Sequence, residues 1–218
     1  MPKKLLITRP NYDVATSYLY SFSKEIIKKI KGVKEIHMAD LQLAKANRNN
    51  FTTVLSKQNP SLIFLNGHGD TTSVTGHKDE SILDEKNINL TKDRIVYALA
   101  CDSLEKLGKI AVTKEKAKAY IGYRASFMFV KDPSRTSSPD KDKNAMPFRK
   151  ACFTLINSLI DGENVSKVIE KTKSQYEEMI RSYGTSEDDP YGDVPLIRFA
   201  LAWDLEFLGM EGDPSVSF

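Results

Sequence analysis

The sequence predicts an α/β protein, a three-layer α/β/α sandwich built around a mainly parallel central sheet. Apolar, strand-like runs alternate with segments of helical periodicity, and the middle runs are apolar almost without interruption. A strand that is apolar at every position has both faces buried, which is typical of a parallel sheet covered by helices on each side. The 218 residues suffice for one sizeable core, so we expect a single domain over residues 1–218.

The first half of the chain begins the alternation. Asn11 or Asp13 can cap the first helix, and the residue before Pro60 ends the second because a following proline disfavours helical backbone. The elements expected, in order, are a strand at 4–8, a helix at 14–30, a short strand at 33–38, a helix at 47–57 and a buried strand at 61–65.

The second half continues the pattern after a polar stretch. Short extended pieces are expected at 82–83 and 88–90, and a helix is expected to begin at Ser103. The other elements expected are strands at 95–100 and 119–123 and helices at 147–160, 164–183 and 194–208. Residues 131–144 are almost devoid of apolar side chains and include two prolines, which predicts an exposed, mobile loop.

Composition limits the classes of function. The 32 basic and 29 acidic residues give a formal charge of +3, too balanced to indicate a nucleic-acid or membrane surface. No run reaches the length of a bilayer-spanning helix or has the character of a signal peptide, so we expect a cytoplasmic protein. The two cysteines do not indicate a disulfide framework, and Cys152, within a helical pattern, is expected to be a small core residue.

Two residues able to do chemistry close neighbouring apolar runs. His68, followed by Gly69, ends the first run, and Cys101, followed by Asp102, ends the second. Because the carboxyl ends of neighbouring parallel strands form one crevice, the imidazole and the thiol are placed to act as general base and nucleophile. The backbone N–H groups of Gly69 and Cys101 are candidates for an oxyanion hole.

A cysteine nucleophile has to be activated. A thiol with an ordinary pKa near 8.5 is only a few per cent ionised at neutral pH. We expect His68 and the amino terminus of a helix beginning near Ser103 to favour the thiolate of Cys101. Each residue also has a structural interpretation, since a cysteine at a strand end is often packing and a histidine in a turn often bonds only to its own backbone.

No metal or cofactor is expected. His77, in a polar loop, can be grouped with His68 and Asp70 as a metal cluster, but these residues lack the short histidine or cysteine pairs that make a zinc site convincing. We therefore expect His77 to be exposed and chemically idle.

The order and spacing of four motifs resemble the caspase-like clan of cysteine peptidases. Histidine-glycine and alanine-cysteine close successive strands 33 residues apart, a strand with the sequence KAYIGYR follows at 118–124, and GDPS stands at 212–215. The CHAT and gingipain-type branches are the most similar. The resemblance implies a caspase-like domain and a cysteine endopeptidase acting on a protein or peptide substrate through His68 and Cys101. It also implies that residues 131–144 border the cleft and that a partner protein, self-cleavage or dimerisation controls activity.

Substrate preference stays open between two alternatives. Asp70, Asp102 and Arg124 all follow strand ends, where members of this clan often place a charged substrate pocket. An acidic pocket would select lysine or arginine, whereas Arg124 would favour an acidic or polar side chain. Asp102 has a further interpretation as a cap of the following helix.

Two other classes of function stay open. The first is a catalytically inactive caspase-like or flavodoxin-like module whose crevice binds a ligand or partner, because fold alone does not determine function. The second is a thiol amidase or transpeptidase that uses the same pair of residues on a small substrate.

Overall fold

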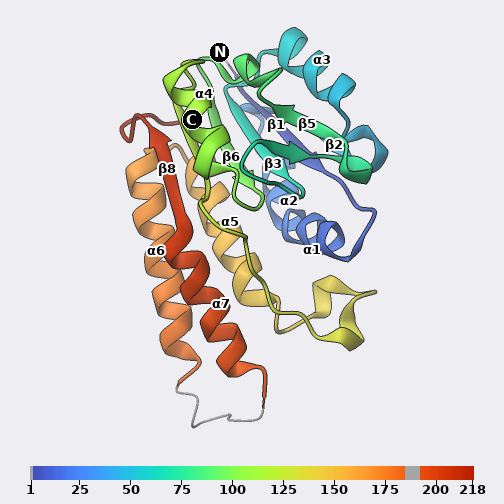
Figure 1. The fold of residues 1–218 in the computed structure, drawn as a ribbon, viewed down its shortest axis with the longest axis vertical. Coiled ribbons are helices and arrows are strands. Elements are labelled where there is room, and N and C mark those ends of the chain that lie inside the picture. The colour runs from blue at the N-terminus through green and yellow to red at the C-terminus, as the bar shows by residue number, and fades with distance from the viewer. Residues whose placement is uncertain (1, 185–191) are drawn as a thin grey trace.

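A six-stranded sheet forms the centre of the molecule (Figure 1). The computed structural model describes residues 2–184 and 192–218. The strand order is β2-β1-β3-β6-β7-β8, in which the first five strands are parallel and β8 is antiparallel to β7. The strands are β1 (Lys3–Arg9), β2 (Ile36–Gln42), β3 (Leu62–Asn66), β6 (Ile95–Leu99), β7 (Ala119–Tyr123) and β8 (Leu208–Gly212). The predicted α/β class and mainly parallel sheet are confirmed.

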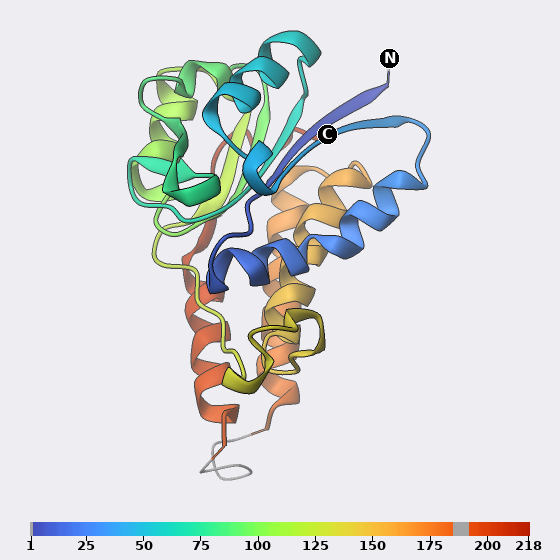
Figure 2. The ribbon, with the colours of Figure 1, turned by 90° about the vertical axis from the view of Figure 1, so that its right-hand side faces the viewer.

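Helices cover both faces of the sheet (Figure 2). Alternate residues of each central strand point to opposite faces, so Leu62 and Phe64 enter one core and Ile63 and Leu65 enter the other. The first face carries α1 (Val14–Phe22), α2 (Lys24–Lys31), α5 (Met146–Ile160), α6 (Val165–Ser182) and α7 (Val194–Phe207). The second face carries α3 (Arg48–Gln58), α4 (Lys109–Thr113) and a hairpin of β4 (Ser73–Thr75) and β5 (Ser81–Asp84). The architecture therefore has three layers.

Several expected elements differ in detail. The helix expected at 14–30 is two helices, separated at Ser23, whose hydroxyl donates to the carbonyl of Tyr20 and competes with the helical ladder. The second strand begins at Ile36 rather than residue 33 and continues to Gln42. The extended piece expected at 88–90 is a 3₁₀ turn, Ile88–Thr91, in which the Thr91 hydroxyl donates to the Ile88 carbonyl. The sequence pattern does not predict strand β8.

Two further features bear on function. Among the described residues, no helix combines the length and the apolar character needed to cross a bilayer. Cys152 is fully buried on α5, as expected, and both cysteines are free thiols.

Most of the polar segment 131–144 is exposed or half-buried, but Asp142 is an exception. Its carboxylate is buried and accepts hydrogen bonds from the Tyr18 hydroxyl (2.5 Å) and from the backbone N–H groups of Asp132 and Asn144 (both 2.9 Å). The segment is thus anchored to α1 through Tyr18, which differs from the prediction that the whole loop is exposed and mobile.

We expect Asp142→Ala to destabilise the protein by roughly 2–4 kcal/mol, because it leaves a buried hydroxyl and two backbone N–H groups without their acceptor. Urea denaturation measures the change in the free energy of unfolding. Limited proteolysis should cut the wild type first within 131–144 and should cut the variant there faster. Replacing the exposed Lys131 by alanine is the control, and equal stability of the Asp142 and Lys131 variants would contradict the anchoring role.

Candidate active site

His68 and Cys101 each lie two residues beyond the carboxyl end of one of two adjacent parallel strands. Strands β3 and β6 pair with a constant offset of 33 residues, from Leu62 opposite Ile95 to Asn66 opposite Leu99. The same offset relates His68 to Cys101, two positions beyond the last pair, and neighbouring strands run about 4.8 Å apart. The prediction that the two runs are adjacent in one sheet is confirmed.

Gly69 brings the two chain segments into close contact. A Cβ atom added to Gly69 would lie 2.7 Å from the carbonyl oxygen of Cys101 and 2.9 Å from the Ala100 side chain. Only glycine therefore fits at this position without displacing the backbone at Cys101. In the described part of the chain, the N–H groups of Gly69 and Cys101 donate no backbone hydrogen bond.

The His68 imidazole is held by Asp13. Its Nε2 lies 2.7 Å from Oδ2 of the carboxylate, and both side chains are about 40% exposed. Asp13 is also the N-cap of α1, where its Oδ1 accepts the Thr16 N–H at 2.8 Å in a capping box. Partial burial would by itself raise the pKa of Asp13, but the hydrogen bonds from Thr16 and His68 outweigh it and lower that pKa.

The position of this pair in the topology follows a general rule for α/β sheets. The chain leaves β1 over one face of the sheet and leaves β3 over the other, so the strand order reverses between these two strands. Ligands of open α/β sheets bind outside the carboxyl ends of the strands at such a switch point. Asp13 follows β1 and His68 follows β3. From the sequence alone, Asp13 is identifiable only as a helix cap.

Cys101 is half-buried, and it lies beside the segment that follows β7. Burial raises the pKa of its thiol, and the negative charges of Asp102 and Asp204 add to the rise. Favourable interactions with the Phe127 backbone and the Ser126 hydroxyl oppose the rise without cancelling it. Among the described residues, the His68 imidazole makes no hydrogen bond to the thiol of Cys101, and its Nε2 bonds to Asp13 instead. The expected stabilisation of a thiolate by His68 and a helix terminus is therefore not seen.

The raised thiol pKa predicts how alkylation depends on pH. Only the thiolate reacts, so the rate of iodoacetamide modification should climb through roughly pH 6 to 10 and reach half its maximum above the ordinary thiol value of about 8.5. Cys152 should stay unreactive because it is buried and burial raises its pKa further. Peptide mapping of the alkylated protein distinguishes the two cysteines, and a rate already at its plateau by about pH 7 would contradict this prediction.

The helix after Cys101 begins irregularly. Asp102 has a left-handed backbone (φ 55°), and the following turn, Leu104–Gly108, is a π-helix that continues into α4. The Asp102 carboxylate accepts from the Ser126 hydroxyl at 3.2 Å, so it connects this turn to the segment after β7. The helix itself starts close to the expected Ser103.

The other two expected substrate residues have structural partners. Asp70 closes the turn before β4, where its Oδ1 accepts the backbone N–H groups of Thr72 (2.6 Å) and Ser73 (2.8 Å). Arg124 pairs with Glu211 of β8, with Nη2 and Oε1 2.8 Å apart. Both stand at the carboxyl edge of the sheet, and both are engaged in holding the loops around it.

His77 differs from the expectation that it is exposed. It is half-buried, its Nδ1 is shielded from solvent, and its ring meets Tyr12 edge to face at 5.5 Å. No group of three or more His, Cys, Asp or Glu side chains within the described ranges is arranged to hold a metal ion.

Comparison with known proteins adds no identification. No model of a known protein family matches the chain, and no curated protein matches it in sequence.

Proposed function

We propose that this protein is a caspase-like cysteine peptidase in which Cys101 is the nucleophile and His68 transfers the proton. The observation that supports the proposal is the register of the adjacent parallel strands β3 and β6, whose offset of 33 residues equals the separation of His68 and Cys101 just beyond their carboxyl ends. In this proposal the backbone N–H groups of Gly69 and Cys101 are the donors that stabilise the oxyanion.

The raised pKa of Cys101 indicates the order of proton transfer. A thiol that is protonated at neutral pH has to lose its proton as it attacks, so His68 acts as a general base rather than as half of a preformed ion pair. The sulfur bonds to the carbonyl carbon of the substrate, and the oxyanion that forms accepts from the N–H groups of Gly69 and Cys101. His68 then returns the proton to the leaving amine. Water, deprotonated by His68, finally hydrolyses the thioester and releases the thiol.

Asp13 serves this chemistry as a positioning residue. Its carboxylate on Nε2 leaves Nδ1 as the nitrogen that exchanges protons with the thiol and the substrate. A carboxylate that orients an imidazole also stabilises the imidazolium formed during the reaction.

The absence of a bond between His68 and the thiol supports control by rearrangement. In the described residues the imidazole is bound to Asp13 and not to sulfur, and the thiol has a raised pKa. Hydrogen bonds of catalytic pairs often tighten only when substrate binds. We propose that substrate, or a regulatory protein partner acting on the surrounding loops, brings His68 and Cys101 into contact.

The rim of the site suits a polypeptide rather than a small amide. Val14 and Leu43, which follow the carboxyl ends of β1 and β2, are large apolar side chains that are 44% and 46% exposed. Both lie on the β1–β2 side of the dyad, where exposed apolar surface is useful to an extended chain that crosses several strand ends and offers little to a substrate confined to the dyad.

The test is labelling by a set of peptidyl acyloxymethyl ketones that differ in the residue next to the reactive carbon. We expect one adduct, mapped by mass spectrometry to Cys101 and not Cys152, and its loss in His68→Ala. Preference for a basic or an acidic probe decides between the two kinds of substrate pocket. Labelling by a small chloroacetamide but by no peptide would favour the small-substrate amidase and overturn the peptidase proposal.

A further inference from the structure

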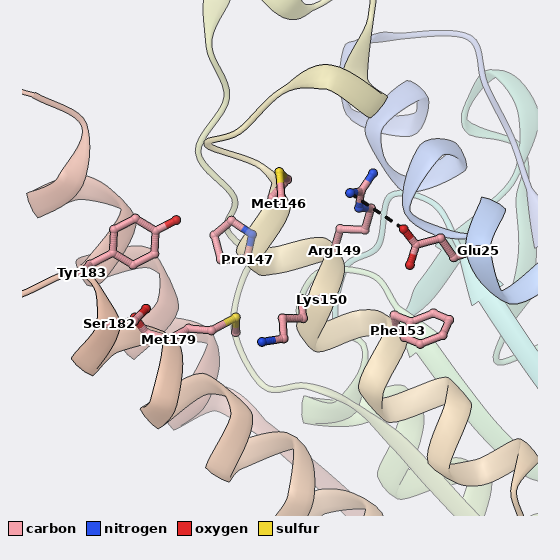
Figure 3. A pocket seen from close by; sticks show the side chains of 9 residues that line it. All are labelled: Glu25, Met146, Pro147, Arg149, Lys150, Phe153, Met179, Ser182 and Tyr183. Carbon is pink, nitrogen blue, oxygen red and sulfur yellow. Dashed lines mark hydrogen bonds and ion pairs between the residues drawn. The ribbon is translucent and has the colours of Figure 1, made fainter.

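A cavity of about 340 Å³ lies between α2, α5 and α6 and shares no residue with the candidate active site (Figure 3). Its lining is mostly apolar and includes Met146 and Phe153 from α5 and Met179 from α6. Cavities of this size with apolar walls and a few convergent polar groups are typical of small-molecule sites. Unbranched methionine side chains adapt their shape to a ligand, which favours a flexible apolar one.

The charges at the cavity favour an anion. Arg149 is neutralised by Glu25, with Nη2 and Oε1 3.8 Å apart. Lys150 has no ion pair among the described residues, and Figure 3 shows its amine directed across the cavity toward Met179. The net charge of these three side chains is one positive charge, held by Lys150.

The first turn of α5 adds to this preference. The N-cap of this 15-residue helix is Ala145, whose side chain makes no capping hydrogen bond, and the first-turn residues Met146 and Pro147 line the cavity. The amino end of a helix carries a partial positive charge from its aligned peptide dipoles. A negatively charged group beside Lys150 therefore meets one full positive charge and this weaker partial charge, part of which the Asp142 carboxylate offsets by accepting the N–H groups of Asn144 and Ala145.

We infer that the cavity binds a small amphipathic anion, a carboxylate with an aliphatic chain. The carboxylate lies between Lys150 and the amino end of α5, and the chain lies along Met179 and Phe153. The apolar walls distinguish this ligand from an inorganic anion, which has no group to place against them. The limited volume distinguishes it from a folded acidic partner.

The experiment is isothermal titration calorimetry with decanoate as the probe, at constant ionic strength. We expect saturable binding of one decanoate per chain. Decyltrimethylammonium has the same chain and the opposite charge, and acetate has the same head without the chain, so both should bind at least tenfold more weakly. Equal binding of decanoate and decyltrimethylammonium, or no saturable binding of decanoate, would overturn the inference.

Two variants locate the site. Lys150→Glu should weaken decanoate binding by roughly tenfold or more, because an attraction becomes a repulsion. Lys57→Glu, on α3 at the opposite face of the sheet, makes the same change in net charge and should leave the affinity unchanged.

A second substitution protects the test against misfolding. Met146 is 48% exposed, and aspartate is favoured in the first turn of a helix, so Met146→Asp should fold normally. This variant should also weaken decanoate binding roughly tenfold, because it adds a negative charge and removes apolar contact. Unchanged affinity in both the Lys150 and Met146 variants would place any bound decanoate elsewhere and contradict the site. Because binding is measured without turnover, the result does not depend on peptidase activity.

Discussion

Cys101→Ala is expected to abolish peptide hydrolysis, a loss on the order of 10⁴-fold or more, because removing the nucleophile leaves only the contributions of binding and the oxyanion donors. The variant should also lose labelling by peptidyl acyloxymethyl ketones. Its free energy of unfolding should change by about 1 kcal/mol or less, since the side chain is half-buried at the edge of the sheet rather than inside a core.

Cys152→Ala is the matched control for the chemistry. It removes the only other thiol in the chain, and this thiol is buried on α5 beneath the sheet. We expect full peptidase activity per folded molecule and a clear loss of stability, because the substitution removes packed volume from the first core. Candidate partner proteins and calcium should be present in both assays, so that an absent activator is not mistaken for inactivity. Peptide hydrolysis by pure Cys101→Ala protein would eliminate the mechanism.

The central strands could be predicted because their residues are apolar at nearly every position. Every residue of β3, β6 and β7 is buried, and continuous apolar runs have few alternatives to a covered parallel strand. Strand β8 could not be predicted in this way. It follows the last helix directly and contains Gly209 and Gly212, and its pairing is fixed by contacts with β7, about 90 residues earlier in the chain.

The site was predictable where it depends on register and unpredictable where it depends on distant contacts. The spacing of 33 residues between His68 and Cys101 is a property of the sequence, and it proved equal to the offset between β3 and β6. The raised pKa of Cys101 has its cause in burial, with a contribution from Asp204 on α7, 103 residues away in sequence. No local pattern records such a contact.

Asp13 shows how one residue can carry two roles of which only one is visible in the sequence. Its position before an apolar helical run predicts an N-cap, and the capping box confirms this role. Its contact with His68 joins the loops after β1 and β3, which the chain brings together only through the strand order. Once the strand order is known, the rule that sites form at switch points identifies the loop after β1, which contains Asp13.

Asp13→Asn is expected to separate these two roles. Asparagine is as good an N-cap as aspartate, so its side-chain oxygen can still accept the Thr16 N–H and the free energy of unfolding at neutral pH should fall by less than about 1 kcal/mol. The amide cannot stabilise an imidazolium as a carboxylate does. We therefore expect kcat to fall on the order of 10²-fold or more, with KM changed little.

The pH dependence of stability checks that the Asp13 carboxylate is ionised in the folded protein, where it accepts from Thr16 and His68. The folded protein lowers the pKa of Asp13, so ionised Asp13 stabilises the fold above its ordinary value of about 3.9, and this contribution is lost as pH falls through the lower folded value. The difference in unfolding free energy between wild type and Asp13→Asn should therefore shrink on acidification below about pH 4. Asp13→Ala, which loses both roles, should be less stable than Asp13→Asn and equally impaired in kcat. Full activity in Asp13→Asn would show that the carboxylate serves the helix alone.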